Sequence, residues 1–278
     1  MWMDMIHFIT LKDVYFLNIY YFLPYFTCIV SNFSLSHSAG LSVPLFYVML
    51  CFTFLQQMKL LLFLMVMGTV SAEIQDLSGK VFTFPRETDT AHVRLNPIKQ
   101  DYNAVTVCHR SFTDLKRDHT FFSLATPFDT SAFLILWQNQ EIDPHVKSER
   151  VEYGGWDYKP NMWHSICTTW DSVTGLVQIW FDGLPSIRRF IISGSITGTV
   201  KAILGQDQDT HGGGFDIHQS FVGMLTDVHI WDYTLSPCEI RHYTEEMHFT
   251  TGNVLNWSAL DFEIIDNVLI ENRFQICH

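Results

Sequence analysis

The pattern of hydrophobic and polar residues beyond residue 72 is typical of an all-β protein. Short runs of β-branched and aromatic residues are separated by turn residues. Asp182-Gly183 lies between the run LVQIWF and a following strand and is a two-residue hairpin signal. Many strands at short spacing over about 200 residues favour one antiparallel β-sandwich domain. The expected strands include 104–108, 132–137, 163–170, 176–181, 190–192 and 228–231.

One stretch late in the chain predicts a helix instead. Ser236 suits the N-cap, Pro237 the first helical position and Glu239 the third, and together they form a capping box. Leu235 and Ile240 fit a hydrophobic staple around it. We therefore expect a helix that runs to about residue 247.

The first 72 residues differ from the rest. Residues 58–72 (MKLLLFLMVMGTVSA) combine a basic start, an apolar core and small residues before a cleavage point, which predicts a signal peptide. Cleavage would leave a secreted mature chain, 73–278. Residues 1–57 are apolar, and we interpret them as an upstream extension outside the mature protein. The alternative is a membrane anchor built from residues 41–55 and 60–67.

The charge balance narrows the function classes. The chain carries a formal net charge of −12 at pH 7. A chain this acidic is not expected to bind nucleic acid or an anionic membrane through bulk charge. It can still bind anionic ligands through a bound cation.

The stretch 205–219 (GQDQDTHGGGFDIHQ) concentrates candidate chemistry. Asp207, Asp209 and Asp216 bring three carboxylates into ten residues, and they repel one another unless a cation sits among them. Gln208 and Gln219 add amide oxygens. Carboxylate, amide and backbone carbonyl oxygens are the ligands that Ca²⁺ takes. The stretch therefore predicts a calcium site.

Glycines 212–214 separate the two acidic halves of this stretch. They allow positive φ angles, which would fold the loop back on an ion. An EF-hand is a poor match, because its twelfth position would be His218 rather than glutamate and the flanking runs read as strands. The alternative is a solvated acidic turn without a metal.

The mature part of the chain keeps four cysteines. An even number behind a signal peptide implies disulfides, and four cysteines allow three pairings that spacing alone does not distinguish. Zinc is disfavoured because the sequence has no C-x-x-C pair. The four are Cys108, Cys167, Cys238 and Cys277.

The run 164–172 (HSICTTWDS) around Cys167 resembles the pentraxin signature H-x-C-x-[ST]-W-x-[ST]. Further resemblances to short pentraxins are VFTFPRETDT near the start, ILGQDQD in the acidic loop, WDYTLSP before the helix and NVLNWSAL near the end. The resemblance implies a jelly-roll sandwich with one helix on a face. It also implies a disulfide between Cys108 and Cys167, and the remaining Cys238 and Cys277 are then expected to pair with each other.

The resemblance also implies two Ca²⁺ ions per subunit, side by side on one face. Asp207 stands where the family usually has glutamate. Gln208 is expected to coordinate through its backbone carbonyl, and Asp209 to bridge both ions. Asp216 falls at an acidic position of the family and Gln219 at a glutamine.

The other half of the family's calcium site departs from the pattern. An ungapped alignment puts Thr130 and Ser131 where the family has an Asp-Asn pair, and Asp129 lies one residue early. Either Asp129 coordinates through a shifted turn, or hydroxyl and carbonyl oxygens hold the first ion less tightly. Leu136 falls where phosphocholine-binding members have a phenylalanine, so a smaller apolar surface would meet the ligand.

These features predict a secreted, calcium-dependent, lectin-like recognition protein with an acute-phase role in innate immunity. The resemblance implies phosphocholine, phosphoethanolamine or acidic carbohydrate ligands, a homo-oligomeric ring that is commonly a pentamer, and complement or Fc receptors as partners. One alternative is a glycoside-active enzyme that uses Asp261 and Glu263 on one side of a strand, since such enzymes need two carboxylates about 5–9.5 Å apart. Another is a structural ring-forming matrix protein.

Overall fold

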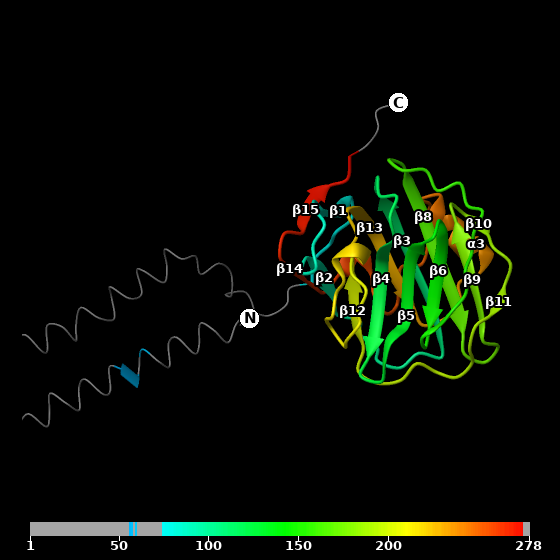
Figure 1. The fold of residues 1–278 in the computed structure, drawn as a ribbon, viewed down its shortest axis with the longest axis horizontal. Helices are drawn as coiled ribbons and strands as arrows, with labels where there is room; N and C mark the ends of the chain where they lie inside the picture. The colour runs from blue at the N-terminus through cyan, green and yellow to red at the C-terminus, as the bar shows by residue number, and fades with distance from the viewer. Residues whose placement is uncertain (1–55, 58, 60–73, 275–278) are drawn as a thin grey trace, which may run out of the picture. The chain divides into compact units, whose positions relative to one another are not determined.

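A computed structural model of the chain describes residues 56, 57, 59 and 74–274 (Figure 1). The signal peptide, the upstream extension and Cys277 lie outside these residues, apart from the three positions near residue 57. Within the part described, no helix is both long and apolar enough to cross a membrane.

Residues 74–274 form two antiparallel sheets. The first has eight strands, in the order β10 (Leu184–Pro185), β9 (Leu176–Phe181), β8 (Trp163–Asp171), β3 (Ala104–Phe112), β13 (Gly223–Trp231), β1 (Lys80–Phe84), β15 (Leu269–Asn272), with β11 (Arg189–Phe190) also paired to β9. The second has seven, in the order β14 (Phe262–Ile265), β2 (His92–Leu95), β12 (Lys201–Leu204), β4 (His119–Thr126), β5 (Asp129–Gln138), β6 (Glu141–Val146), β7 (Glu149–Arg150).

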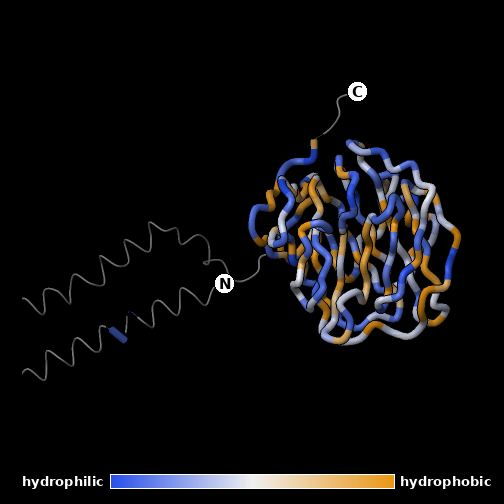
Figure 2. The backbone as a smooth tube through the Cα atoms, viewed as in Figure 1, coloured by the Kyte–Doolittle hydropathy of each residue, from blue (hydrophilic) through white to orange (hydrophobic). Residues whose placement is uncertain are grey.

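The main core lies between the two sheets. Hydrophobic and hydrophilic residues follow one another closely along the backbone (Figure 2). This is expected for strands, because successive side chains of a strand point to opposite faces of the sheet. The inward side chains come from both sheets and are almost fully buried, which confirms the predicted antiparallel sandwich. They include Phe82, Val107, Ile166 and Leu225 from the eight-stranded sheet and Val93, Phe122, Phe133 and Leu204 from the seven-stranded sheet.

The local predictions hold at the hairpin and at the helix. Asp182 and Gly183 have φ angles of 48° and 79°, and β9 pairs with β10 across them. The helix α3 spans Pro237–Thr244 and has the full capping box, with Ser236 N donating to Glu239 Oε2 at 2.9 Å. It ends three residues before the predicted end. Two short 3₁₀ helices are also present, η1 (Ile217–Gln219) between β12 and β13 and η2 (Trp257–Ala259) between α3 and β14.

Two sequence interpretations need correction. The strand expected at 190–192 begins one residue earlier, at Arg189, and ends at Phe190, after which Ile191 N makes one more bond in the same register, to the carbonyl of Gly175. The position of the histidine also departs from the signature. The pattern puts it two residues before the cysteine, a position that Ser165 occupies, and His164 lies one residue earlier. His164 instead contacts Asp182, with Nδ1 2.8 Å from Oδ2.

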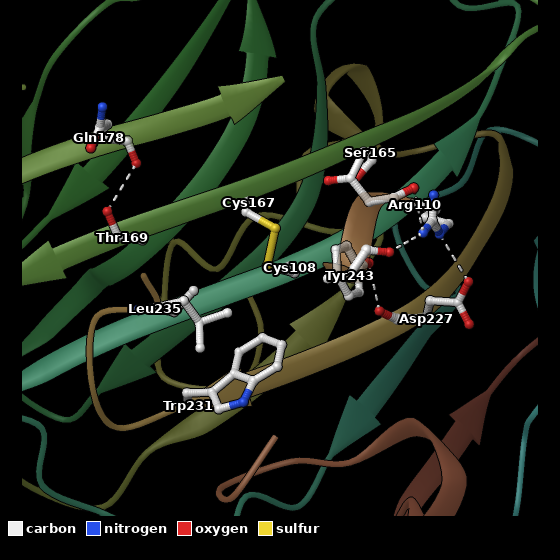
Figure 3. Close-up of a disulfide and its surroundings, with 12 residues drawn as sticks. Cys108, Arg110, Ser165, Cys167, Thr169, Gln178, Asp227, Trp231, Leu235 and Tyr243 are labelled. Atoms are coloured by element: carbon white, nitrogen blue, oxygen red, sulfur yellow. Dashed lines mark hydrogen bonds and ion pairs between the residues drawn. A yellow bond between two sulfur atoms is a disulfide. The ribbon is translucent and has the colours of Figure 1, made fainter. Parts of the chain in front are cut away.

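The disulfide between Cys108 and Cys167 is present, as predicted (Figure 3). The two residues lie directly opposite each other on the paired strands β3 and β8. Their side chains face away from the main core and pack under α3. A second apolar cluster forms there, from Cys108, Cys167, Trp180, Trp231, Leu235, Ile240 and Tyr243.

A buried arginine anchors the far end of α3 (Figure 3). Arg110 Nη2 donates to the carbonyl of Tyr243 at 2.6 Å, and its Nε lies 3.1 Å from Asp227 Oδ2. The cationic group therefore lies on the carbonyls at the C-terminal end of the helix, where a positive charge is favourable. Asp227 reaches this position because β13 bulges between Thr226 and His229, and its φ angle is 51°. Arg273 reaches the same carboxylate at 3.3 Å.

Candidate functional site

The acidic loop 205–216 leaves the end of β12 and folds back over the outer face of the seven-stranded sheet. Gly205 N donates to the carbonyl of Phe121, and Ser123 Oγ donates to the carbonyl of Gln206 at 2.8 Å. Gln208 Nε2 donates to the carbonyls of Ser123 at 3.2 Å and Lys201 at 3.0 Å. The loop is thus fixed to strands β4 and β12, which flank each other in the sheet.

Glycines make the reversal of this loop possible. Thr210 and Gly213 bond to each other through both backbone groups, each at 3.0 Å, and so close a tight turn. Gly212 and Gly214 have φ angles of 88° and 74°, which confirms the expected positive φ at two of the three glycines, whereas Gly213 does not adopt it. A Cβ at Gly214 would lie 3.0 Å from the backbone nitrogen of Thr210. A larger residue at 214 would therefore disturb the turn.

Asp207 is the unusual residue of the loop. Its side chain is buried, with 8% of the residue exposed, and Oδ1 has no hydrogen-bond partner among the described residues. Burial, together with the charge of Asp209, raises the pKa of Asp207 to about 6. Asp209 is exposed beside it. Two adjacent carboxylates with one buried oxygen unpaired form a site that favours a cation.

Gln208 differs, because its side chain is already fully used. Its Nε2 holds β4 and β12, and its Oε1 accepts from Gly212 N at 2.9 Å. This leaves its backbone carbonyl as the atom that could bind a cation, and coordination through this carbonyl stays a prediction.

Asp216 and Gln219 bound the next turn. Asp216 is exposed and caps η1, with Oδ1 accepting from His218 N at 2.9 Å. Gln219 is half-buried at the end of η1. Arg117 Nη1 donates to the carbonyls of His218 at 3.0 Å and Ser220 at 2.7 Å, and these bonds hold the segment in place. Both predicted ligands therefore lie in one anchored turn after the glycines.

Asp129, Thr130 and Ser131 open strand β5 and are half-buried. Asp129 Oδ1 accepts from Ser131 N at 3.0 Å and from Ser148 Oγ at 2.7 Å. The turn that joins β4 to β5 precedes Asp129. It lies at the same end of the sheet as the start of β12, because Lys201 is the register partner of Ala125. Lys201 Nζ in turn donates to the carbonyl of His211 in the acidic loop. The tip of the acidic loop at His211 and the start of β5 at Asp129 therefore lie at the same end of the sheet.

The described residues do not form a closed cluster of ligands. Across 74–274, no three His, Cys, Asp or Glu side chains gather closely enough to hold a metal. The loop half nevertheless suits Ca²⁺, since Asp207 offers an unpaired buried oxygen and Asp209 an exposed one. The hairpin half offers Asp129, whose Oδ1 is already bonded within the turn.

A further acidic residue that the sequence analysis did not place lies opposite Leu136. The register of the sheet puts Thr120, Leu136 and Asp143 in one row across β4, β5 and β6. Leu136 and Asp143 are 2% and 1% exposed, and Asp143 Oδ1 has no partner among the described residues. Burial, and the charges of Glu152 and then Glu141, raise the pKa of Asp143 to about 7.

The sequence held a signal for Asp143. Ile142 and Val146 of strand β6 point into the core, and successive side chains of a strand point to opposite faces. Asp143, the residue after Ile142, is therefore expected to point to the outer face. Arg150 lies near this carboxylate, because its charge opposes the rise in the pKa of Asp143, and its Nη1 lies 3.4 Å from Gln138 Oε1.

The carboxylates of the enzyme alternative have separate partners. Asp261 accepts from Asn96 Nδ2 at 3.0 Å, and Glu263 forms an ion pair with Arg94 at 2.6 Å. Glu263 lies on β14, an edge strand of its sheet. This is the arrangement of a solvated edge strand.

A separate hollow of about 890 Å³ opens beside α3, away from the acidic loop. Arg110, Asp227 and Arg273 line it with aromatic side chains, among them Trp257. Its charged groups already pair with one another.

Comparison with known proteins identifies relatives over nearly all of the described domain. Residues 80–272 match the family model described as the Pentaxin family. Jeltraxin of Lepidobatrachus laevis is 36% identical over 203 residues, which cover 71% of this chain and 90% of the relative. C-reactive protein of Cavia porcellus is 36% identical over 231 residues (77% and 97%), and serum amyloid P-component of Sus scrofa is 34% identical over 220 residues (77% and 98%).

Among solved structures, a native heptameric SAP-like pentraxin from Limulus polyphemus has a similar fold. The TM-score is 0.63 at 22% identity, and the match covers 72% of this chain and 96% of that one. The likeness confirms the predicted jelly-roll sandwich.

Proposed function

The chain belongs to the pentaxin family, and from that premise we propose that it is a secreted, calcium-dependent pattern-recognition protein of innate immunity. Its ligands would be phosphate-bearing or acidic groups on microbial and damaged-cell surfaces. Family membership supports the recognition role, and C-reactive protein and serum amyloid P-component are recognition proteins rather than enzymes.

The observation that carries the calcium proposal is the unpaired, buried oxygen of Asp207 beside the charge of Asp209. These two carboxylates, the backbone carbonyl of Gln208, and the side chains of Asp216 and Gln219 would hold two calcium ions. Oxygen atoms of Asp129, Thr130 and Ser131 would complete the set from the hairpin. When bound, the ions would supply the positive charge that draws a phosphate or an acidic sugar group.

Leu136 and Asp143 support a second contact for the ligand. An ammonium group on a phosphoethanolamine-type ligand would pair with the Asp143 carboxylate, and Leu136 would offer a small apolar surface. Both residues are nearly buried, so a ligand would reach them only when neighbouring side chains on the outer face move aside. We expect phosphocholine to bind less tightly, because its three methyl groups need more apolar surface than one leucine supplies.

Assembly into a ring would raise the avidity of weak sites, because neighbouring sites on one face act at high effective concentration. The solved Limulus relative is heptameric, and a pentamer is expected from the family resemblance. The face that carries α3 would be left for complement or Fc receptors.

The test is retention of the secreted protein on phosphoethanolamine and phosphocholine resins, followed by elution with a chelator. Asp209→Ala should abolish calcium-dependent retention, whereas Asp157→Ala should not, because Asp157 is an exposed carboxylate outside the loop. Chelator-sensitive retention of Asp209→Ala would contradict the two-ion site and make Asp129 the next residue to test. A scaffold protein would not be retained at all, and a glycoside-active enzyme would release sugar from an oligosaccharide.

A further inference from the structure

The tripeptide Asn256-Trp257-Ser258 follows the N-x-[ST] pattern of N-glycosylation acceptors, with no proline in the middle position. The pattern occurs at one other place in the sequence, Asn32-Phe33-Ser34, which precedes the predicted signal peptide. Asn256 is therefore the single acceptor expected in the mature chain.

The structure gives this tripeptide a suitable local geometry. Asn256 caps η2, and its Oδ1 accepts from Ser258 N at 3.1 Å and from Ser258 Oγ at 3.0 Å. The amide oxygen is thus engaged by the serine of the motif. Among the described residues, Asn256 Nδ2 makes no hydrogen bond. Asn256 is half-buried, and its unpartnered Nδ2 is not among the buried polar atoms of the described residues, so the amide nitrogen reaches solvent.

A nearby asparagine provides a contrast. Asn253 Nδ2 donates to Asp232 Oδ1 at 2.6 Å, and Asn253 Oδ1 accepts from Asp232 N at 3.1 Å. Its amide is fully used for structure, and its sequence Asn253-Val254-Leu255 is no acceptor. The free Nδ2 of Asn256 is therefore not a general property of this loop.

We propose that Asn256 is N-glycosylated as the chain enters the secretory pathway, an inference that rests on the secretion proposed above. Asn256 Nδ2 would lose one proton and form a bond to C1 of the reducing-end N-acetylglucosamine of a lipid-linked oligosaccharide. The bond from that C1 to the diphosphate oxygen breaks, and the lipid diphosphate leaves. The amide carbonyl and the serine hydroxyl are retained.

The site determines which face of the domain carries the glycan. Trp257 N lies 3.5 Å from Nδ1 of His229, whose ring packs in the aromatic group beside α3. Trp257 and Ser258 both line the hollow beside α3. The glycan would therefore stand at the rim of this hollow, on the outer side of the eight-stranded sheet. The acidic loop lies on the outer face of the other sheet and would remain open to ligand.

The test is expression of the full chain in secreting animal cells, followed by treatment with peptide N-glycosidase F. We expect a faster-migrating band after treatment and a peptide that carries aspartate at position 256. Ser258→Ala and Asn256→Gln should remove the shift, while Ser258→Thr should keep it because the hydroxyl remains. Asn253→Gln, as a control, should also keep it.

The outcomes separate this inference from the proposed function. Protein that is secreted and retained on the phosphoethanolamine resin, but unmodified at Asn256, would overturn the inference and leave the function standing. A chain that stays unmodified in the cytosol would overturn both. Retention on the resin should be the same before and after removal of the glycan, and loss of retention would contradict its placement away from the acidic loop.

Discussion

Asp227 is a half-buried carboxylate and Asp207 a buried one, and they lie in regions with opposite properties. Asp227, beside α3, contacts Arg110 at 3.1 Å and Arg273 at 3.3 Å. Asp207, in the acidic loop, has an oxygen with no partner among the described residues. Burial raises the pKa of both. When a charge removed from water has a partner of opposite charge, the pair contributes to the fold. A buried charge without such a partner lowers the stability of the fold, and a bound ligand can remove that loss. We therefore expect the α3 region to serve stability and the acidic loop to serve binding.

The largest effect on stability should come from the disulfide under α3. Cys167→Ser should lower the free energy of unfolding by about 4 kcal/mol on the chain-entropy estimate for a loop of this length. This is a large part of a typical domain stability of about 5–15 kcal/mol, so secretion should also fall. Denaturant unfolding of the purified variant measures the loss.

The double variant Cys108→Ala with Cys167→Ala removes the bond without an unpaired thiol or hydroxyl and should lose a similar amount. Peptide mapping under non-reducing conditions checks the remaining pair, since Cys238 is exposed and Cys277 lies outside the described residues. A link from Cys238 to Cys277 is expected, and a link from Cys108 to either would be inconsistent with the structure.

Next in size is Arg110→Met, which removes the buried cation but keeps an apolar side chain. Breaking a buried ion pair costs about 3–5 kcal/mol. We expect about 3 kcal/mol, because Arg273 still reaches Asp227. The matched control is Arg94→Met, which breaks the exposed pair with Glu263 and should cost less than about 1 kcal/mol. Equal losses in urea denaturation of the two variants would remove the distinction between the two regions.

Asp143→Asn extends the comparison to a second buried carboxylate that is unpaired like Asp207. An acid whose folded pKa is about 7, against an ordinary value of 3.8, loses stability as pH rises between these values. The asparagine variant should therefore be more stable than the wild type above pH 7, by about 2 kcal/mol, which is roughly half of the full conversion of the shift. The advantage should vanish below about pH 4. Thermal denaturation of both proteins from pH 4 to 8 measures this stability difference. A difference that stays the same across this pH range would show that Asp143 does not titrate as described.

The smallest effect on the fold alone should be that of Asp209→Ala. This exposed side chain makes no hydrogen bond with any residue that the structure describes, so in chelator the free energy of unfolding should change by less than about 0.5 kcal/mol. In the wild type, calcium at 100 times its dissociation constant should add about 2.7 kcal/mol per site. The variant should lose this gain. Denaturation with calcium and with chelator gives both numbers, and a large loss in chelator would mean that the acidic loop is structural after all.

The sequence was sufficient where a few neighbouring residues decide the structure. The hairpin at Asp182-Gly183, the capping box at Ser236 and the positive-φ glycines of the acidic loop all follow from local chemistry. The flanks of that loop are strands, as predicted. The calcium ligands named from the sequence stay predictions.

The sequence was insufficient where distant residues meet. Arg110 and Asp227 are 117 residues apart, and their contact depends on a bulge in β13 that no local pattern marks. Asp143 faces Leu136 only through the register of β5 and β6. The early end of α3 has a similar cause. Glu246 takes a φ angle of 54°, and Arg110 from β3 already occupies the last carbonyls.

The cross-strand bond between β3 and β8 also has a mechanical consequence. The 59-residue separation between Cys108 and Cys167 encloses strands β4, β5, β6 and β7, and with them the hairpin of Asp129. Under tension applied at the two chain ends, force passes through the sulfur atoms and bypasses this segment. The oxidised chain should extend about 200 Å less than the reduced chain, at about 3.3–3.6 Å per residue. Shear on a surface-bound molecule would therefore load the acidic loop before it reached Asp129.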